Sequence, residues 1–335
     1  MKMEEFVTLD YGSGGGKTAK LISEMIVPLF SNEALNELSD GAVVDGADKI
    51  VMSTDSFVVS PVFFPGGDIG KLSVCGTVND VSMAGGEIKY LSLACILEEG
   101  FPFADVKKIL DSIQRTAGEA GVMVVTGDTK VVERGRGDGI YINTTGVGVL
   151  KTPGLSVKNL RAGDKIIVSG PVGDHGTAIM LARNANLVEA DVKSDCAPLK
   201  RMALALGKLG KDLRVMRDPT RGGLATTLNE FIEDSEYGIE LKEDAIPVRP
   251  AVNTVCDMLG LDPLYLACEG RMICAAAPEA EERALEILRS FPEGEGAVTI
   301  GEVTSAHPGT LVIRTALGTG RIANKLAGDQ LPRIC

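Results

Sequence analysis

Five aspartates of the sequence lie where a short apolar run meets a turn. They are Asp40, Asp55, Asp80, Asp128 and Asp218. Carboxylates brought together from several loops are the hard oxygen ligands that Mg²⁺ takes alongside the phosphates of a substrate. Each aspartate could instead cap a turn or a helix, and Asp218 in particular could cap the helix that contains Leu224. Their number, with few other metal ligands in the chain, favours a site for Mg²⁺ and a nucleotide.

A glycine tract near the start of the chain runs Gly12-Ser13-Gly14-Gly15-Gly16-Lys17-Thr18. A P-loop would need a further glycine at position 11, which is Tyr11, so the tract is not a P-loop. Backbone N–H groups of such a loop could still approach a phosphate. A plain N-terminal loop is the alternative, and both interpretations stay open.

Two cationic side chains could serve the same chemistry. Thr220-Arg221-Gly222-Gly223 begins a predicted helix and could hold an anion through backbone N–H groups and the guanidinium of Arg221. Lys130 follows Asp128 by two residues, so on a strand both side chains face the same side. Such a lysine could contact phosphate or transfer a proton, or it could simply be solvated.

The composition excludes several functions. The net charge of −12 argues against binding to nucleic acid or to anionic membranes. We expect no membrane span, because no apolar run approaches about 18 residues. The seven cysteines include no Cys-x-x-Cys pair and are odd in number, which argues against a zinc motif and a disulfide framework. With no N-terminal signal pattern, these features predict a reduced, cytoplasmic protein.

Mixed strand and helix patterns must position these residues. Helical spacing covers 104–120 and ends at Gly121, and helices are also predicted at 175–183, 197–209, 219–233 and 279–290. Predicted strands cover 41–45, 49–53, 122–125, 140–149, 165–169, 300–303 and 311–314. Without strict βαβ alternation, we expect an α/β protein with α+β mixed sheets rather than a Rossmann sheet. A change of composition at 150–163 predicts domains at 1–150 and 151–314, followed by a mobile C-terminal tail at 315–335.

Four segments carry a resemblance to a known family. They are Thr54–Pro61 with Phe64–Gly70, Gly76-Thr77-Val78-Asn79-Asp80, Gly127-Asp128-Thr129-Lys130-Val131-Val132, and the terminal Pro332-Arg333-Ile334-Cys335. Together they resemble the HypE family of hydrogenase maturation proteins. That family belongs to the superfamily of aminoimidazole ribonucleotide synthetase and selenophosphate synthetase. The terminal Pro-Arg-Ile-Cys is the specific mark of the family.

The resemblance implies a two-domain, PurM-like ATP-binding fold that forms a homodimer through its N-terminal halves. Asp40, Asp55, Asp80 and Asp128 would carry the Mg²⁺–ATP, with Asp218 from the second domain. Gly14, Gly15, Asn79, Lys130 and Arg221 would add nucleotide contacts. Lys130 and Glu269, in Cys268-Glu269-Gly270, would handle protons.

The activity implied by the resemblance is carbamoyl dehydration. A carbamoyl group on Cys335, donated by the carbamoyltransferase HypF, would lose water at the cost of ATP and become a thiocyanate. The cyanide would then pass to the HypC–HypD complex, for the iron centre of [NiFe] hydrogenase. Sulfur at the end of a tail suits this role, because the arm could visit several sites, and the other six cysteines are expected to be small core residues.

Three alternatives remain open from the residues. Cys335 could be an incidental terminal residue. The enzyme could act on a free small molecule, although a catalytic cysteine near the glycine tract is missing. The chain could also be a carrier without catalysis.

Overall fold

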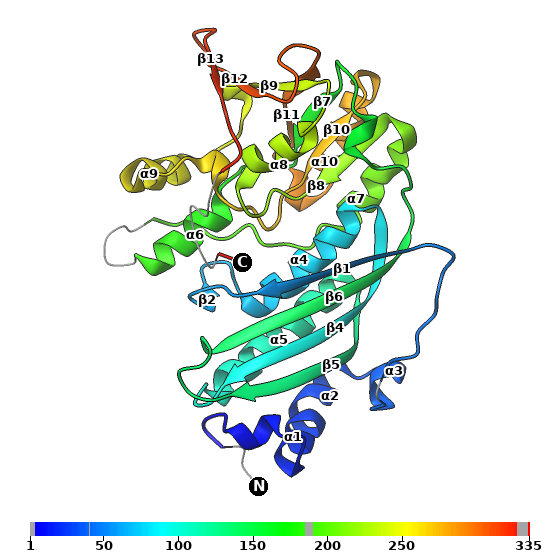
Figure 1. Cartoon of the computed structure of the whole chain (residues 1–335), viewed down its shortest axis with the longest axis vertical. Coiled ribbons are helices and arrows are strands. Elements are labelled where there is room, and N and C mark those ends of the chain that lie inside the picture. The colour runs from blue at the N-terminus through cyan, green and yellow to red at the C-terminus, as the bar shows by residue number, and fades with distance from the viewer. Residues whose placement is uncertain (1–3, 40, 185–189, 327–333) are drawn as a thin grey trace.

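The computed structural model describes residues 4–39, 41–184, 190–326 and 334–335. Two α/β halves lie one above the other, and the C-terminal residue lies between them (Figure 1). The mixed α/β class predicted from the sequence is confirmed. Within the residues described, no helix is long and apolar enough to cross a membrane.

The N-terminal half is built on a four-stranded sheet of order β1-β6-β4-β5. The strands are β1 (Ile50–Phe57), β4 (Gly86–Glu98), β5 (Met123–Val132) and β6 (Ile140–Leu150). Helices α4 (Ile69–Met83) and α5 (Phe103–Ala120) cover one face of the sheet, whereas no helix of the described residues covers the opposite face (Figure 1). Strands β4 and β5 are parallel and the other pairs are antiparallel.

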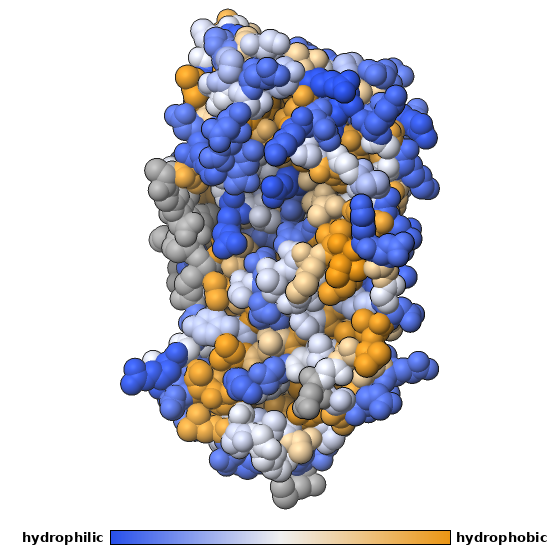
Figure 2. Space-filling model, turned by 45° about the vertical axis from the view of Figure 1, so that its right-hand side comes forward, coloured by the Kyte–Doolittle hydropathy of each residue, from blue (hydrophilic) through white to orange (hydrophobic). Residues whose placement is uncertain are grey.

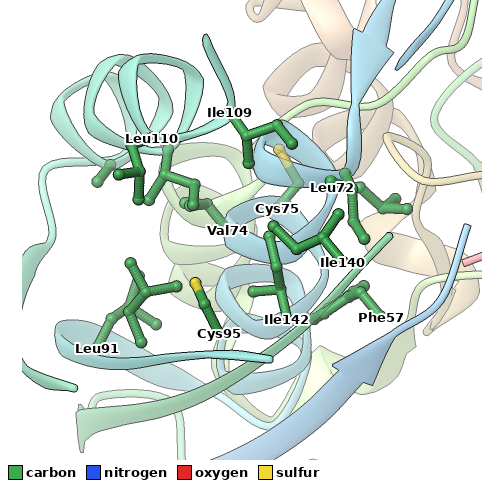
Figure 3. Close-up of a cluster of buried hydrophobic side chains, with 14 of the residues drawn as sticks. Phe57, Leu72, Val74, Cys75, Leu91, Cys95, Ile109, Leu110, Ile140 and Ile142 are labelled. Carbon is green, nitrogen blue, oxygen red and sulfur yellow. The ribbon is translucent and has the colours of Figure 1, made fainter. Parts of the chain in front are cut away.

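The core of this half lies between the sheet and these two helices. Figure 3 shows Leu72 and Cys75 of α4 and Ile109 of α5 above Leu91 and Ile142 of the strands, and all five are buried. Helix α4 is buried on almost all sides, because the C-terminal half packs against the side that the sheet and α5 leave free. A helix buried all round needs no amphipathic pattern, so its periodicity is weak.

Local chemistry sets the ends of the two helices. The side chain of Asp68 accepts hydrogen bonds from the N–H groups of Gly70 and Lys71, which caps the start of α4. Helix α5 ends at Gly121, whose φ of 61° lies in the left-handed region that glycine adopts without strain. The helix predicted at 104–120 and its stop at Gly121 are confirmed.

The C-terminal half holds a seven-stranded sheet of order β13-β12-β9-β11-β7-β10-β8. Its strands are β7 (Lys165–Val168), β8 (Leu213–Arg217), β9 (Gly238–Lys242), β10 (Ile273–Ala276), β11 (Val298–Thr304), β12 (Leu311–Arg314) and β13 (Gly320–Ile322). Its helices are α6 (Asp174–Arg183), α7 (Lys200–Leu206), α8 (Gly223–Ile232), α9 (Pro250–Leu259) and α10 (Glu281–Arg289).

Alternation along strand β10 shows how this sheet is buried on both faces. Ile273 and Ala275 pack in the core that contains α8, whereas Cys274 and Ala276 pack with α7 and α10. Successive side chains of a strand point to opposite faces of the sheet. A strand that has a packed core on each face, such as β10, must therefore be apolar at every position.

Short elements complete the chain. They are α1 (Gly16–Leu21), a π-helical turn (Ile22–Ile26), α2 (Val27–Phe30), α3 (Glu33–Asn36), β2 (Phe63–Phe64) and β3 (Gly67–Asp68). Turns of 3₁₀-helix lie at Leu9–Gly12, Val157–Asn159, Gly207–Asp212, Glu243–Ala245, Pro263–Tyr265, Pro278–Ala280 and Pro292–Gly294.

Two sequence expectations about elements are wrong. Residues 41–45 form no strand and are largely exposed, because no neighbouring strand pairs with them. The prediction of a mobile tail at 315–335 is wrong for part of that segment, since β13 pairs with β12 and Ala323 is buried. Residues 327–333 of the predicted tail, with Pro332 and Arg333, lie outside the described residues.

Candidate active site

Three of the predicted aspartates meet between the two halves. Asp55 comes from the middle of β1, Asp80 from α4 and Asp218 from the turn after β8. Burial raises the pKa of Asp80, and the charge of Asp55 adds to the shift. Burial raises the pKa of Asp218 to about 7, and the charges of Asp80 and Asp55 contribute. The three residues therefore form one electrostatically coupled carboxylate cluster.

This carboxylate cluster fits a hydrated cation. Oδ2 of Asp218 is buried and has no hydrogen-bond partner among the described residues, whereas Oδ2 of Asp80 accepts a hydrogen bond of 2.8 Å from Ser53. In the described part of the chain, no three His, Cys, Asp or Glu side chains converge tightly enough to enclose a metal by themselves. Mg²⁺ ordinarily keeps several waters and substrate oxygens, so an open cluster with an unpartnered carboxylate oxygen suits it.

The structure contradicts the alternative that Asp218 caps a helix. Helix α8 begins at Gly223, and no side chain caps its start. Gly222 and Gly223 have φ values of 77° and 60°, and a side chain on Gly222 would collide with Thr226. The turn therefore needs both glycines, and Asp218 is left free to face the cluster. Arg221 lies close enough for its charge to lower the pKa of Asp80.

Glu269 lies deep beside this cluster. The residue is 2% exposed, and within the part of the chain that the structure describes its Oε1 has no hydrogen-bond partner. Burial raises the pKa of Glu269 well above its usual value, and the neighbouring Cys196 and Asp218 add to the shift. A buried carboxyl group with a raised pKa is a candidate for general acid–base chemistry.

An extended segment, 194–197, holds the backbone of Glu269. Asp195 accepts a hydrogen bond of 3.1 Å from the N–H of Glu269, and Ala197 donates one of 3.4 Å to its carbonyl. Gly270 follows because the backbone of Asp195 leaves no room there for a Cβ atom. The Cys-Glu-Gly motif thus places a buried carboxyl where two backbones cross.

Asn79 has a different place from the one expected. It is fully buried, and its amide donates to the carbonyls of Ala197 at 3.2 Å and Glu269 at 3.3 Å. Its Oδ1 accepts from the N–H of Leu199 at 2.8 Å. With these partners Asn79 joins the two halves and is closed to a nucleotide, while Asp80, the next residue of α4, faces the cluster.

The C-terminal Cys335 reaches the same place. Ile334 is buried in the hydrophobic core of the N-terminal half, and Cys335 packs against it. Burial raises the pKa of the Cys335 thiol well above its usual value, and the adjacent Glu269 also raises it. Arg221 acts in the opposite direction. The other six cysteines are buried, as expected for core residues.

Asp128 and Lys130 form a second, separate group. Lys130 Nζ lies 3.0 Å from Asp128 Oδ1, which confirms that the two side chains share one face of β5. The register places Asp128 in line with Ala94, Asn143 and Ser56, three strands away from β1 and about 14 Å distant. Because Ser56 and Asp55 point to opposite faces of β1, Asp128 does not join Asp55 within one chain.

The glycine tract borders this second group. A cavity of about 690 Å³ is lined by Gly14, Thr18 and Thr126–Lys130, with part of the segment 34–42. The N–H of Gly14 donates to Thr18 Oγ1 at 3.0 Å, and Gly15 is exposed. Asp40 lies outside the described residues.

The expectation that the aspartates follow strand ends is wrong for three of them. Asp80 lies within α4, and Asp55 and Asp128 lie within strands that continue beyond them. Sequence reasoning did not predict a role for His175, which contacts the carbonyl of Ile334, or for Ser194, which contacts the ring of His175. Their signal in the sequence was weak, since a lone histidine in the first turn of a helix such as α6 has many structural uses.

Comparisons with known proteins agree along the chain. Residues 38–150 match the family model of the AIR synthase related protein N-terminal domain, and residues 161–314 match that of the C-terminal domain. A carbamoyl dehydratase HypE from Bradyrhizobium diazoefficiens is 48% identical over 332 residues, covering 98% of this chain and 96% of that protein.

Solved structures are similar as well. A crystal structure of the hydrogenase maturation protein HypE in complex with ATP has a TM-score of 0.93 and 49% identity, over 98% of this chain and 99% of that one. A HypE chain in a HypE–HypF complex has a TM-score of 0.80 and 45% identity, over 91% and 99% of the two chains.

Proposed function

Since the chain belongs to the HypE family of carbamoyl dehydratases, we propose that it dehydrates a carbamoyl group carried on its own Cys335. The product is a thiocyanate on the same sulfur, which supplies cyanide for the iron of [NiFe] hydrogenase. The observation that carries the proposal is the position of Cys335 against the buried Glu269, between the two halves.

Loss of water from the carbamoyl group needs two things from the site. The carbamoyl oxygen must become a leaving group, and both protons must be removed from the nitrogen. Mg²⁺–ATP supplies the phosphoryl group that turns this oxygen into a leaving group, and ADP and phosphate are formed. The oxygen departs with that phosphate and the S–C bond stays intact. One of the two nitrogen protons passes to the base and the other to the departing phosphate.

Glu269 is our candidate for the nitrogen proton. Its carboxyl group lies beside the Cys335 side chain, and its raised pKa lets it hold a proton that it has taken. Burial of both residues also excludes water, which would hydrolyse an activated carbamoyl group. Lys130, the second candidate for proton transfer, lies on the other face of the sheet within one chain, so it could act only from a second copy of the chain.

Asp55, Asp80 and Asp218 are proposed to hold Mg²⁺, with Arg221 beside the phosphates. A cation there would offset the burial and the mutual repulsion that raise the pKa of Asp80 and Asp218. We propose that a second group of residues also contacts the nucleotide. It consists of Asp128, Lys130, Gly14, Gly15 and Asp40. ATP as the nucleotide is supported by the similar structure solved with ATP.

A homodimer is proposed through the uncovered face of the four-stranded sheet. Ile50, Met52, Ile96 and Met123 are apolar and between 41% and 64% exposed. The alternating burial of β1 puts Ile50 and Met52 on the face opposite to α4, the face that bears Asp128. Orange, apolar side chains reach the surface of this lower half, whereas the upper half is mostly blue (Figure 2). A second copy would cover this face and enclose Asp128 and Lys130.

HypF is proposed as the carbamoyl donor, because a similar HypE chain was solved in complex with HypF. The HypC–HypD complex is proposed as the cyanide acceptor. Both partners would need Cys335 outside its buried position, so the terminal segment must leave the site and return.

The test uses full-length protein carbamoylated at Cys335 by a HypF protein. After addition of Mg²⁺ and ATP, mass spectrometry of the C-terminal peptide should show the loss of one water. Cys335→Ala should yield no modified peptide, whereas Cys256→Ala, a buried cysteine in another core cluster, should behave like the wild type.

Two results would contradict the proposal. ATP turnover on a free amide that is unchanged in Cys335→Ala would favour a small-molecule enzyme. Undiminished thiocyanate formation in the double variant Lys130→Ala, Glu269→Ala would favour a carrier without catalysis.

A further inference from the structure

We propose that His175 is a positioning residue that fixes the register of the terminal segment, by donating a hydrogen bond from Nε2 to the carbonyl of Ile334. The proposal rests on the function above, in which Cys335 carries the reacting group. It assigns a purpose to the one buried histidine, which the carboxylate and proton-transfer chemistry leave unused.

The contacts of His175 fix the direction of each hydrogen bond. Nε2 lies 2.9 Å from the carbonyl oxygen of Ile334, and Nδ1 lies 2.8 Å from Oγ of Ser194. A carbonyl can only accept, so Nε2 carries the proton and Nδ1 must accept from the Ser194 hydroxyl. Oγ of Ser194 in turn accepts from the N–H of Cys196 at 3.1 Å. The chain of donors therefore runs in one direction, from Cys196 to Ile334.

The ring of His175 is shielded from water. His175 is fully buried, and the edge-to-face contact with Phe64 has a centroid distance of 5.5 Å. Burial lowers the pKa of His175 to about 4, so the ring is neutral at physiological pH and keeps the single proton that the network needs.

The same short segment positions both reacting groups. Ser194 orients the ring that holds the peptide carbonyl just before Cys335. Asp195 and Ala197 hold the backbone of Glu269. The segment 194–197 therefore positions both a carbamoyl group on Cys335 and the carboxyl group of Glu269. Positioning of this kind lowers a barrier without contact to the reacting atoms.

The contact also sets how long Cys335 stays in the site. When the terminal segment leaves, the Nε2–H group of His175 loses its acceptor in a buried place, which is unfavourable. His175 thus favours the docked segment over the released one. Loss of the contact should release Cys335 more often and orient it less well.

The experiment compares His175→Ala, His175→Gln and Ser194→Ala in the full-length protein. The first readout is the rate at which iodoacetamide alkylates Cys335, mapped by mass spectrometry in protein without carbamoyl groups. The second is single-turnover dehydration of the carbamoylated protein with Mg²⁺ and ATP. The third is the rate of carbamoylation by HypF. His307→Asn, at the exposed second histidine, is the control.

We expect His175→Ala to raise the alkylation rate of Cys335 about tenfold and to slow dehydration by about 10- to 100-fold, consistent with loss of a positioning contact. Carbamoylation by HypF should be unchanged or faster. His175→Gln keeps an N–H donor and should restore most of both properties. Ser194→Ala should be intermediate, because the ring is then free to take the other tautomer.

Several outcomes would overturn the inference. The inference would be refuted if folded His175→Ala showed wild-type rates of alkylation and dehydration. It would also be refuted if folded His175→Gln restored neither rate relative to His175→Ala. If His175→Ala does not fold, the Gln and Ser194→Ala variants still decide. If the wild type forms no thiocyanate, the proposed function fails, whereas alkylation still reports whether His175 holds the segment.

Discussion

The amide of Asn79, in α4, donates a hydrogen bond of 3.3 Å to the backbone carbonyl of Glu269, in the other half of the molecule. Asp80, the next residue of the helix, belongs to the carboxylate cluster. One helix thus holds the candidate base by its backbone and supplies a candidate metal ligand. The distance between the two functions depends on how the two halves pack.

Replacing Asn79 tests this link. Asn79→Ala removes the donor to the carbonyls of Ala197 and Glu269 and the acceptor of the Leu199 N–H, and among the described residues it leaves the Glu269 carbonyl only the 3.4 Å hydrogen bond from Ala197. The loss should cost about 1–3 kcal/mol of stability and reduce dehydration beyond what that loss explains. The matched control is Asn229→Ala, because Asn229 also donates to two carbonyls, away from the site. Urea unfolding and single-turnover dehydration are the measurements. Equal losses of activity in both variants would refute a specific role.

Glu269→Gln should slow dehydration by about 10²- to 10⁴-fold, the usual range for loss of a general acid–base group. Stability should be unchanged or higher, because the variant removes a buried carboxyl with an unpartnered oxygen. Single-turnover kinetics and thermal melts measure the two effects. Glu279→Gln, at an exposed glutamate, should change neither. Full activity in Glu269→Gln would shift the proton-transfer role to Lys130.

Asp218→Asn should weaken Mg²⁺-dependent ATP binding at least about tenfold, which is equivalent to about 1.4 kcal/mol. Without Mg²⁺ the same variant should melt at a higher temperature near pH 8, because the wild type must then keep a buried, repelled carboxylate. Calorimetry of ATP binding and melts with and without Mg²⁺ separate the two effects. Asp257→Asn, at an exposed aspartate of α9, is the control. Unchanged binding would exclude Asp218 as a ligand.

Burial lowers the pKa of His175 from an ordinary 6.5 to about 4, with Arg183 adding to the shift. Between these values the unfolded chain binds a proton that the folded protein does not. The contribution of this residue to stability is therefore lost as the pH falls from about 6.5 to about 4. We expect His175→Gln to flatten the dependence of the unfolding free energy on pH over this range, measured in urea. His307→Asn should leave the slope in place, and an equal slope in His175→Gln would show that other groups cause it.

Met52→Asp should convert the proposed dimer into a monomer, because it buries a carboxylate in the apolar face of the four-stranded sheet. Light scattering after size-exclusion chromatography gives the mass. Met258→Asp is matched in exposure, at 61% against 64%, and lies on α9, away from this face. A wild-type monomer, or a dimeric Met52→Asp, would contradict the proposed interface.

The sequence alone determined the local structures and the identity of the chemical groups. The apolar spacing at 104–120 and the glycine at 121 define a helix and its end, because both depend only on neighbouring residues. The strands at 140–149 and 165–169 were also predicted, from short apolar runs. The aspartates, Glu269 and the terminal cysteine were also found from the sequence, since their types and motif positions do not depend on packing.

Only the tertiary structure decided which of these groups meet. The register of β1, β6, β4 and β5 puts Asp128 three strands from Asp55 and on the other face, although both lie in similar motifs. Packing of the two halves brings the amide of Asn79 into hydrogen-bond contact with the backbone carbonyl of Glu269. It also brings His175 to the carbonyl of Ile334, the residue before Cys335. These relations depend on hydrogen bonds between residues far apart in the chain. A local pattern cannot specify them, because the free energy that selects them comes from burying both halves together.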